Sequence, residues 1–172
     1  MKRSEAAKMR IVNILKKAVL HMMWLVVVHV VSAVLALGPA FAFPWVLRPT
    51  SSAAEMASCL DLVDRLEVFP KIFGTLTLLS GVALVIFGSY GSFAQVWIAG
   101  SLLLFAAVQV LVIALMTPAA KKLRASLAEA GETMQREASA AGCALYARVR
   151  RYHAAAGVLS FLILLLMIVK PR

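Results

Sequence analysis

The sequence predicts an all-α integral membrane protein in which four antiparallel transmembrane helices form one bundle. Hydrophobic residues make up 62% of the 172 positions and charged residues 15%, whereas soluble domains average about 45–50% and about 25%. Four apolar segments come close to the roughly 20 residues that a helix needs to cross the hydrocarbon core. The charged residues lie in the tails and connections, so we expect residues 1–172 to form a single membrane domain.

The first predicted span covers about residues 18–46, which contain no charged side chain. Its prolines, Pro39 and Pro44, predict a kink or an early end of the helix, because proline has no N–H to donate. The basic tail before it, residues 1–17, is typical of a short helix at the membrane interface. Ala40-Phe41-Ala42 would suit signal-peptide cleavage, but the apolar run exceeds the usual length of roughly 7–15 residues. We therefore interpret it as a transmembrane helix.

Residues 50–69 form the first connection, and we expect a short amphipathic helix there, at the membrane surface. Ser52 followed three residues later by Glu55 is the pattern of a capping box at the start of a helix. The second span, about residues 70–90, begins at Pro70. Proline suits the first helical position because an N–H there has no partner within the helix.

The third span covers about residues 93–116 and the fourth about residues 154–169. Between them, residues 117–152 place apolar side chains at steps of three and four. This spacing predicts an amphipathic helical hairpin that extends both spans beyond the bilayer, with its turn near Gly131. Within the third span, we expect Gln109 to hydrogen-bond to another helix rather than to a ligand.

The net charge of +10 predicts contact with anionic lipid headgroups, because the basic residues flank the spans. Nucleic-acid binding is not indicated, since no soluble domain is present to carry it. Eight Lys and Arg lie on the side of the two termini and ten on the other side, so the positive-inside rule does not decide the orientation. The basic N-terminal tail favours termini in the cytoplasm.

The two cysteines, Cys59 and Cys143, fall in the two connections on the same side of the membrane. They would form a disulfide if that side is oxidising, or remain thiols if it is cytoplasmic. Both alternatives stay open. No CxxC motif is present, so the sequence does not indicate a zinc site or a covalently attached haem.

His29 is the chief candidate for a functional side chain. It lies near the middle of the first span, where an ionisable group is energetically unfavourable and suggests a functional site. His29, Ser32, Ala33 and Ala36 share one helical face, which we expect to face the bundle. Two interpretations remain open: a neutral histidine bonded to a neighbouring helix, or a haem ligand or proton-relay site.

Three further sets of residues were weighed as sites. Met167 falls at the depth of His29, and His/Met is a known axial pair for haem, although methionine also commonly fills space in a bundle. His21, Met22 and Met23 suggest a Cu(I) site, because thioethers suit that ion. His153 is expected at the mouth of the fourth span, about 15 Å in depth from His29, so the two cannot share one metal.

The sequence does not favour an enzyme. Every Asp and Glu lies outside the predicted spans, so a carboxylate relay for protons is not indicated. We also find no nucleophile–base arrangement and no phosphate-binding loop.

Several landmarks are spread over nearly the whole chain: His29 followed by Gly38, Arg65-Leu66 with Pro70, the run from Leu76 to Leu84, and the end Met167-Ile168-Val169-Lys170-Pro171. Together they resemble the CopD-like superfamily of small membrane proteins, and most closely a group of four-span proteins without an assigned function. A more distant resemblance is to the HemJ type of protoporphyrinogen oxidase. That resemblance implies a cofactor-binding role for His29. The chain departs from the HemJ type in the third span, which has no His or Lys, and in the start of the fourth span.

Two classes of function follow from these features. In the first, the protein is a non-catalytic subunit or accessory protein of a larger membrane assembly, for example a respiratory or other redox complex in the bacterial inner membrane. In the second, it binds haem b through His29 and acts in electron transfer or porphyrinogen oxidation. Copper handling through His21, Met22 and Met23 ranks third.

Overall fold

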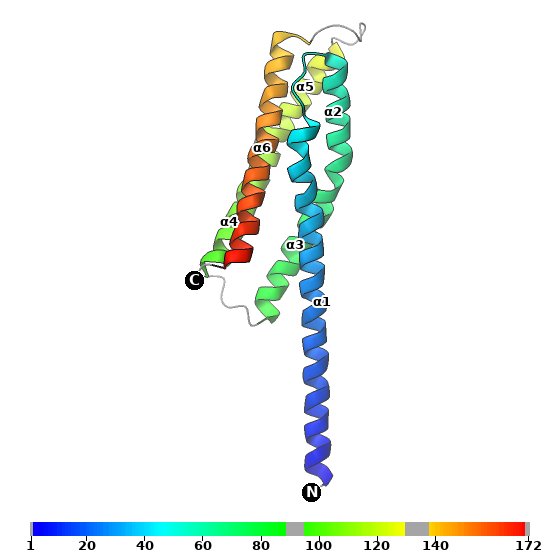
Figure 1. Cartoon of the computed structure of the whole chain (residues 1–172), viewed down its shortest axis with the longest axis vertical. Helices are drawn as coiled ribbons and strands as arrows, with labels where there is room; N and C mark the ends of the chain where they lie inside the picture. The colour runs from blue at the N-terminus through cyan, green and yellow to red at the C-terminus, as the bar shows by residue number, and fades with distance from the viewer. Residues whose placement is uncertain (1, 89–94, 130–137, 171–172) are drawn as a thin grey trace.

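The computed structural model describes residues 2–88, 95–129 and 138–170, and every regular element among them is a helix. In chain order these are α1 (Lys2–Val46), α2 (Ala53–Leu66), α3 (Val68–Phe87), α4 (Val96–Val110), the π-helix η1 (Leu111–Met116), α5 (Thr117–Glu129) and α6 (Ala140–Val169) (Figure 1). Four helical segments are long and apolar enough to cross a membrane. The predicted all-α, four-span architecture is therefore confirmed.

The connections also have the predicted character. Ser52 caps α2, because its side chain accepts a hydrogen bond from the N–H of Glu55. The second connection is the expected helical extension of both spans: α4, η1 and α5 follow one another without a break, and α6 already begins at Ala140. The expected turn at Gly131, and the ends at Tyr90 and Phe93, lie outside the described residues.

The first span ends at residue 46, as predicted, and of the two effects expected from its prolines, a kink or an early end, the early end does not occur. α1 continues through Pro39 and Pro44 to Val46. Each proline removes one backbone hydrogen bond, that of the carbonyl four residues earlier. In a transmembrane helix, close packing by neighbouring helices can compensate for such a loss.

The four spans are arranged around two central helices. α1 contacts α3 on one side and α6 on the other, and α4 packs against α6. Within the described residues, no comparable contact joins α3 to α4. The bundle is therefore open between α3 and α4. The N-terminal part of α1 extends well beyond the ends of the other spans (Figure 1).

The largest buried core lies at the connection end of the molecule, and we call it the cap cluster. It joins the end of α1, α2, α5 and the first half of α6. Its buried members are Phe43, Leu47, Met56, Leu60, Val63, Ala119, Leu123, Tyr146 and Val149. Burying each large apolar side chain contributes about 1.5–3 kcal/mol. Elsewhere the spans expose many apolar side chains, as expected of surfaces that face lipid.

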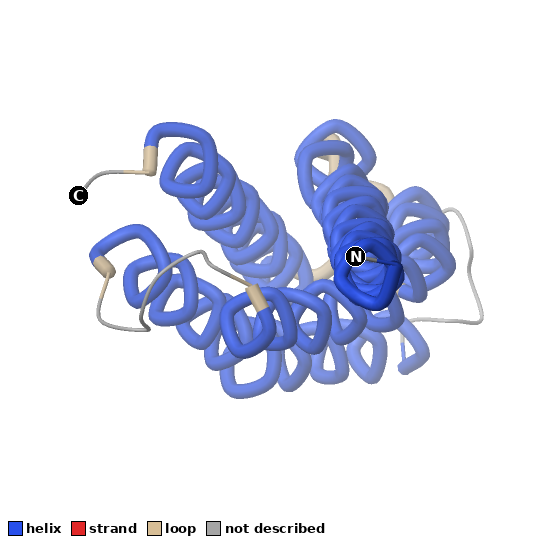
Figure 2. Tube along the Cα trace, turned by 90° about the horizontal axis from the view of Figure 1, so that it is seen from below, coloured by secondary structure: helices blue, strands red, loops and turns tan. Residues whose placement is uncertain are grey.

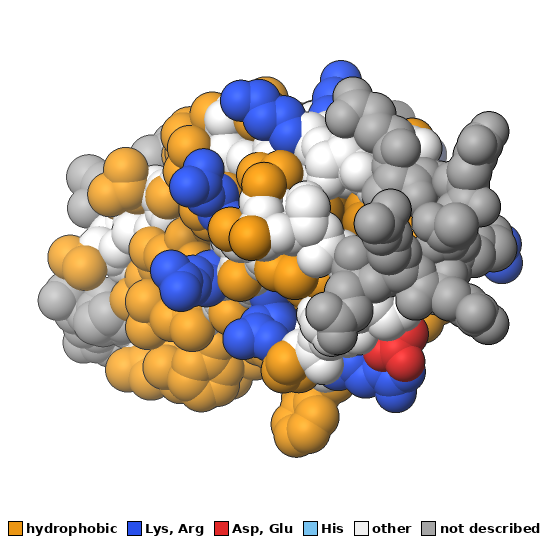
Figure 3. All heavy atoms as spheres, turned by 90° about the horizontal axis from the view of Figure 1, so that it is seen from above, with side chains coloured by type: hydrophobic (Ala, Val, Ile, Leu, Met, Phe, Trp, Pro, Cys, Tyr) orange, Lys and Arg blue, Asp and Glu red, His pale blue; other side chains and the backbone are white. Residues whose placement is uncertain are grey.

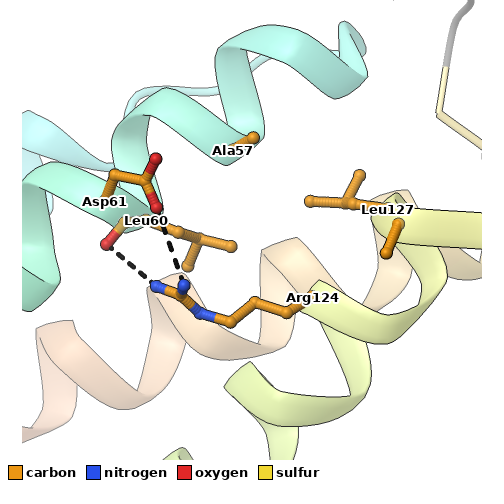
Figure 4. Close-up of a pocket in the computed structure, with 6 residues that line it drawn as sticks. Ala57, Leu60, Asp61, Arg124 and Leu127 are labelled. Carbon is orange, nitrogen blue, oxygen red and sulfur yellow. Dashed lines mark hydrogen bonds and ion pairs between the residues drawn. The ribbon is translucent and has the colours of Figure 1, made fainter. Parts of the chain in front are cut away.

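Two polar contacts reinforce the cap cluster. Tyr146 of α6 donates from its hydroxyl to the carbonyl of Arg48, 2.9 Å away, just beyond α1. Arg124 of α5 reaches α2, where it pairs with Asp61 and donates to the carbonyl of Leu60 (Figure 4). It also pairs with Asp64. Because the hairpin is tied to α2 in this way, it is part of the fold rather than an appendage.

The contact between α1 and α6 depends on a glycine and a proline. Pro44 has no N–H, so the carbonyl of Ala40 lacks its usual partner within the helix. Gly157 of α6 faces this carbonyl, and a Cβ at position 157 would lie 3.3 Å from the Ala40 oxygen. A residue without a side chain lets the two backbones approach closely at this level.

A wider helical turn precedes Pro118. The N–H and the hydroxyl of Thr117 both donate to the carbonyl of Val112, five residues back, in the pattern of a π-helix. Since Pro118 cannot donate a backbone hydrogen bond, this turn lets α4 continue into α5 without an end between them.

Replacing Gly157 by leucine should destabilise the protein, because the new side chain must push α6 away from the Ala40 carbonyl. We expect a loss of about 1–3 kcal/mol, as for other overpacked interfaces, measured as a lower unfolding temperature in mild detergent. Gly38→Leu is the matched control, because a Cβ at position 38 meets nothing within 4 Å. Equal unfolding temperatures for the two variants would contradict this account.

Candidate functional site

His29 faces α3, and its ring is held by that helix. The Nδ1 atom lies 3.0 Å from the carbonyl oxygen of Thr77 and 3.1 Å from Oγ of Ser80. The expected inward face of the first span is confirmed, because Ser32 and Ala36 are buried and His29 is half-buried.

The partner of Nδ1 determines the tautomer of His29. A carbonyl oxygen can only accept, so Nδ1 carries the proton and donates it to Thr77. Ser80 can accept from the same N–H, since its own hydroxyl donates to the Leu76 carbonyl at 2.7 Å. In the neutral ring, Nε2 therefore keeps a free lone pair. This arrangement fixes the orientation of the imidazole against α3.

Gly81 provides the space for the ring. A Cβ at position 81 would lie 2.9 Å from Cε1 of His29, closer than real side chains approach one another. Ser80, a small and buried residue beside Gly81, also allows α1 and α3 to pack closely along this face. His29 therefore fills a place that a glycine leaves open.

The contact between His29 and Gly81 predicts coupled effects of mutation. We expect Gly81→Ala to destabilise the protein while His29 is present, because the ring must shift and its hydrogen bonds lengthen. In the His29→Ala background the same change should be nearly neutral. A double-mutant cycle of thermal unfolding should give a coupling of about 0.5–3 kcal/mol. Additive effects would show that the ring does not occupy this position.

A second polar group lies deeper in the protein, around His153. The sequence predicts His153 at the mouth of the fourth span, and the structure shows that its side chain is buried there, with only 2% of its surface exposed. It belongs to the buried stripe of α6, which repeats at steps of three and four through Tyr146, Val149, Ala156 and Ser160. Its ring also packs edge-on against Phe43 of α1, with the centroids 5.0 Å apart.

The His153 side chain faces a carboxylate. Its Nδ1 atom donates to the carbonyl of Val149 at 3.0 Å. Its Nε2 atom is buried without a hydrogen-bond partner, 3.8 Å from Oε1 of Glu67. The other carboxylate oxygen of Glu67 pairs with Lys71 at 2.9 Å. The contact with Glu67 brings α6 close to the start of α3.

Sequence reasoning missed Glu67 as a buried partner. The i,i+4 spacing of Glu67 and Lys71 could have indicated the first pair, and the stripe through His153 could have indicated that His153 faces inward. Which acidic residue meets His153 depends on the packing of α6 against the junction of α2 and α3. No local sequence pattern contains that information.

Removing the Glu67 carboxylate should destabilise this junction. We expect Glu67→Gln to lower stability by about 1–3 kcal/mol, because the Glu67 carboxylate is largely buried, pairs with Lys71 and faces the buried Nε2 of His153. Glu55→Gln is the control, since Glu55 is an exposed carboxylate whose ion pair with Arg48 spans 3.7 Å in solvent. The control should change stability by less than about 0.5 kcal/mol, measured by thermal unfolding in the same detergent.

The structure does not bring the other candidate residues together with His29. Met167 lies half-buried on α6, whose lower part stands apart from α1 (Figures 1 and 2). His21 and Met23 are exposed on α1 and Met22 is half-buried. In residues 2–88, 95–129 and 138–170, no three His, Cys, Asp or Glu side chains are placed to hold one metal ion.

Both cysteines are free thiols in the structure. Cys59 of α2 and Cys143 of α6 are partly buried and pack against the cap cluster from different helices. Nothing in their placement requires a disulfide to hold the two helices together.

The model of a family described as predicted integral membrane proteins (DUF2269) matches residues 23–171, which include nearly all of the four spans. No curated protein and no solved structure is similar enough to this chain to give a match.

Proposed function

Because the chain belongs to the DUF2269 family of predicted integral membrane proteins, we propose that it acts as a non-catalytic subunit or accessory protein of a larger membrane assembly. A respiratory or other redox complex of the bacterial inner membrane is the setting that we favour. The observation that carries this proposal is the open side of the bundle between α3 and α4.

An open bundle leaves two of its spans with one helical neighbour each. Among the spans and within the described residues, α3 packs mainly on α1, and α4 mainly on α6. The face of α3 turned away from His29 exposes Ile72, Leu79 and Ile86, which are spaced at steps of seven. Helices of another subunit can pack against such a face through van der Waals contacts and interhelical hydrogen bonds.

The connection end offers a second surface for an assembly. Seen from that end, Lys and Arg side chains lie among apolar ones (Figure 3). The exposed basic residues of α5 and α6 include Lys121, Lys122, Arg148 and Arg151. This surface suits anionic headgroups or the acidic face of a neighbouring subunit.

A large side chain on the free face of α3 should disrupt the assembly. The tagged protein, extracted from its native membrane in mild detergent, is expected to migrate with a stoichiometric second membrane protein. We expect Leu79→Trp to remove most of that protein, while Val34→Trp on α1 retains it; the two positions are 62% and 64% exposed. Migration of the wild-type chain without any other protein would overturn the proposal.

Haem b binding through His29 is the second candidate, and one observation favours it. Histidines that bind a metal usually donate their other ring N–H to a carbonyl or carboxylate, as His29 does to Thr77. Nε2 is the atom that would bind iron, through its free lone pair. The resemblance to CopD-like and HemJ-type proteins supports the same role for His29, whereas Met167, predicted as a second axial ligand, lies on a part of α6 that stands apart from α1 (Figures 1 and 2). A copper site at His21, Met22 and Met23 has no comparable support from the geometry.

An absorption spectrum separates the two candidates. If His29 binds haem, the purified protein should show a b-type spectrum after reduction with dithionite, and His29→Ala should abolish it. His21→Ala is the control and should leave the spectrum unchanged. A colourless protein purified intact from its native membrane would rule against haem and leave the accessory role.

A further inference from the structure

Gln109 is a polar residue in the apolar part of α4, and the rest of the described chain leaves its side chain exposed. The continuous apolar helix formed by α4 and η1 runs from Val96 to Met116. Gln109 lies about three residues from its middle, or roughly 4.5 Å along the axis. Its side chain is exposed, and no residue in the described part of the protein forms a hydrogen bond with it.

An amide in this position needs a partner. Its NH₂ group donates two hydrogen bonds and its oxygen accepts, and hydrocarbon offers neither donors nor acceptors. Leaving such a group unpaired in an apolar medium costs at least about 1–3 kcal/mol. Another helix in the membrane is the available source of a partner, because glutamine side chains hydrogen-bond between transmembrane helices.

The surroundings of Gln109 on α4 suit a closely packed helix. Ala99, Leu102, Ala106 and Gln109 follow one another at steps of three, four and three, and all four are exposed. That spacing is the seam along which two helices pack at a small crossing angle. The two alanines allow the backbones of two such helices to approach closely, so that the Gln109 amide of one helix can reach that of the other.

We propose that α4 pairs with α4 of a second copy of this chain, with the two Gln109 amides hydrogen-bonded to each other across the two-fold axis. Two copies inserted in the same orientation place Gln109 at the same depth without any further adjustment. An amide is both donor and acceptor, so two identical side chains satisfy each other, as a two-fold interface requires. This inference does not depend on the proposed accessory function.

Cysteine cross-linking tests the orientation of the pair. In a full-length background with Cys59→Ala and Cys143→Ala, Ala106→Cys lies on the proposed seam. Ala107→Cys is the control: it is also exposed, but it points about 100° away around the helix. In liposomes that contain only this protein, oxidation should cross-link Ala106→Cys at least five times more than Ala107→Cys. Equal cross-linking would overturn the proposal.

The contribution of the amide is tested by replacing it. Gln109→Leu should weaken dimerisation about three- to tenfold, the range expected for an interhelical hydrogen bond in a membrane, and Gln109→Asn should retain more of it. Thr75→Val is the control, because the hydroxyl of Thr75 donates to the Lys71 carbonyl of its own helix. Förster transfer between labelled copies at decreasing protein-to-lipid ratios gives the dissociation constants.

Two results would refute self-association. One is a monomeric wild-type protein in liposomes at all protein-to-lipid ratios. The other is a dimer whose dissociation constant is the same for Gln109→Leu and the wild type. If, in native membranes, Ala106→Cys cross-links only to a different protein, the seam serves the assembly and not a second copy. Failure of the liposome experiment alone leaves the accessory function standing, because that function is tested by extraction from native membranes.

Discussion

The close contact between α1 and α6 holds the two halves of this protein together. α3 packs on α1 and α4 packs on α6, so the contact between the two central helices joins the halves within the spans, as the cap cluster does at the connection end. Their contact relies on Gly157, which brings a backbone without a side chain up to the Ala40 carbonyl. The same carbonyl lacks a helical partner because of Pro44. Pro44 would weaken an isolated helix, but in this protein it lies where α1 and α6 make a close contact.

The polar side chains follow one rule throughout the described chain: within the spans, most are bonded to backbone carbonyls. Thr75, Thr77, Ser80 and Ser101 donate to carbonyls of their own helices. His29 and His153 do the same with one ring nitrogen each, His29 to a neighbouring helix and His153 to its own. The second nitrogen of each imidazole forms no hydrogen bond in the described chain. In His153 this nitrogen faces the Glu67 carboxylate, and in His29 it has no partner. Gln109 has no hydrogen-bond partner in the described chain, and under the proposal above its partner comes from a second copy.

The sequence predicted those features that depend on composition and on periodicity. Four apolar segments, the cap at Ser52, the inward face around His29 and the helical second connection all follow from local patterns, and the structure contains each of them. The burial of His153 was missed because the expected fourth span began after it, whereas α6 begins at Ala140 and carries the stripe of buried residues past it. The meeting of His153 with Glu67 and of Gly157 with Ala40 joins residues far apart in the chain. Such pairs depend on how whole helices cross, which a single sequence does not encode in any local pattern.

The position of the cap cluster has a consequence for biosynthesis. Its residues come from two stretches, Phe43 to Val63 and Ala119 to Val149, that leave the ribosome far apart in time. The first three spans can enter the membrane one by one, since each is apolar enough to do so alone. They cannot complete their shared core until Tyr146 and Val149 have been synthesised. The nascent chain therefore passes through a stage in which α2 and α5 expose apolar surface at the membrane boundary. Such surface is prone to aggregation until the last helix covers it.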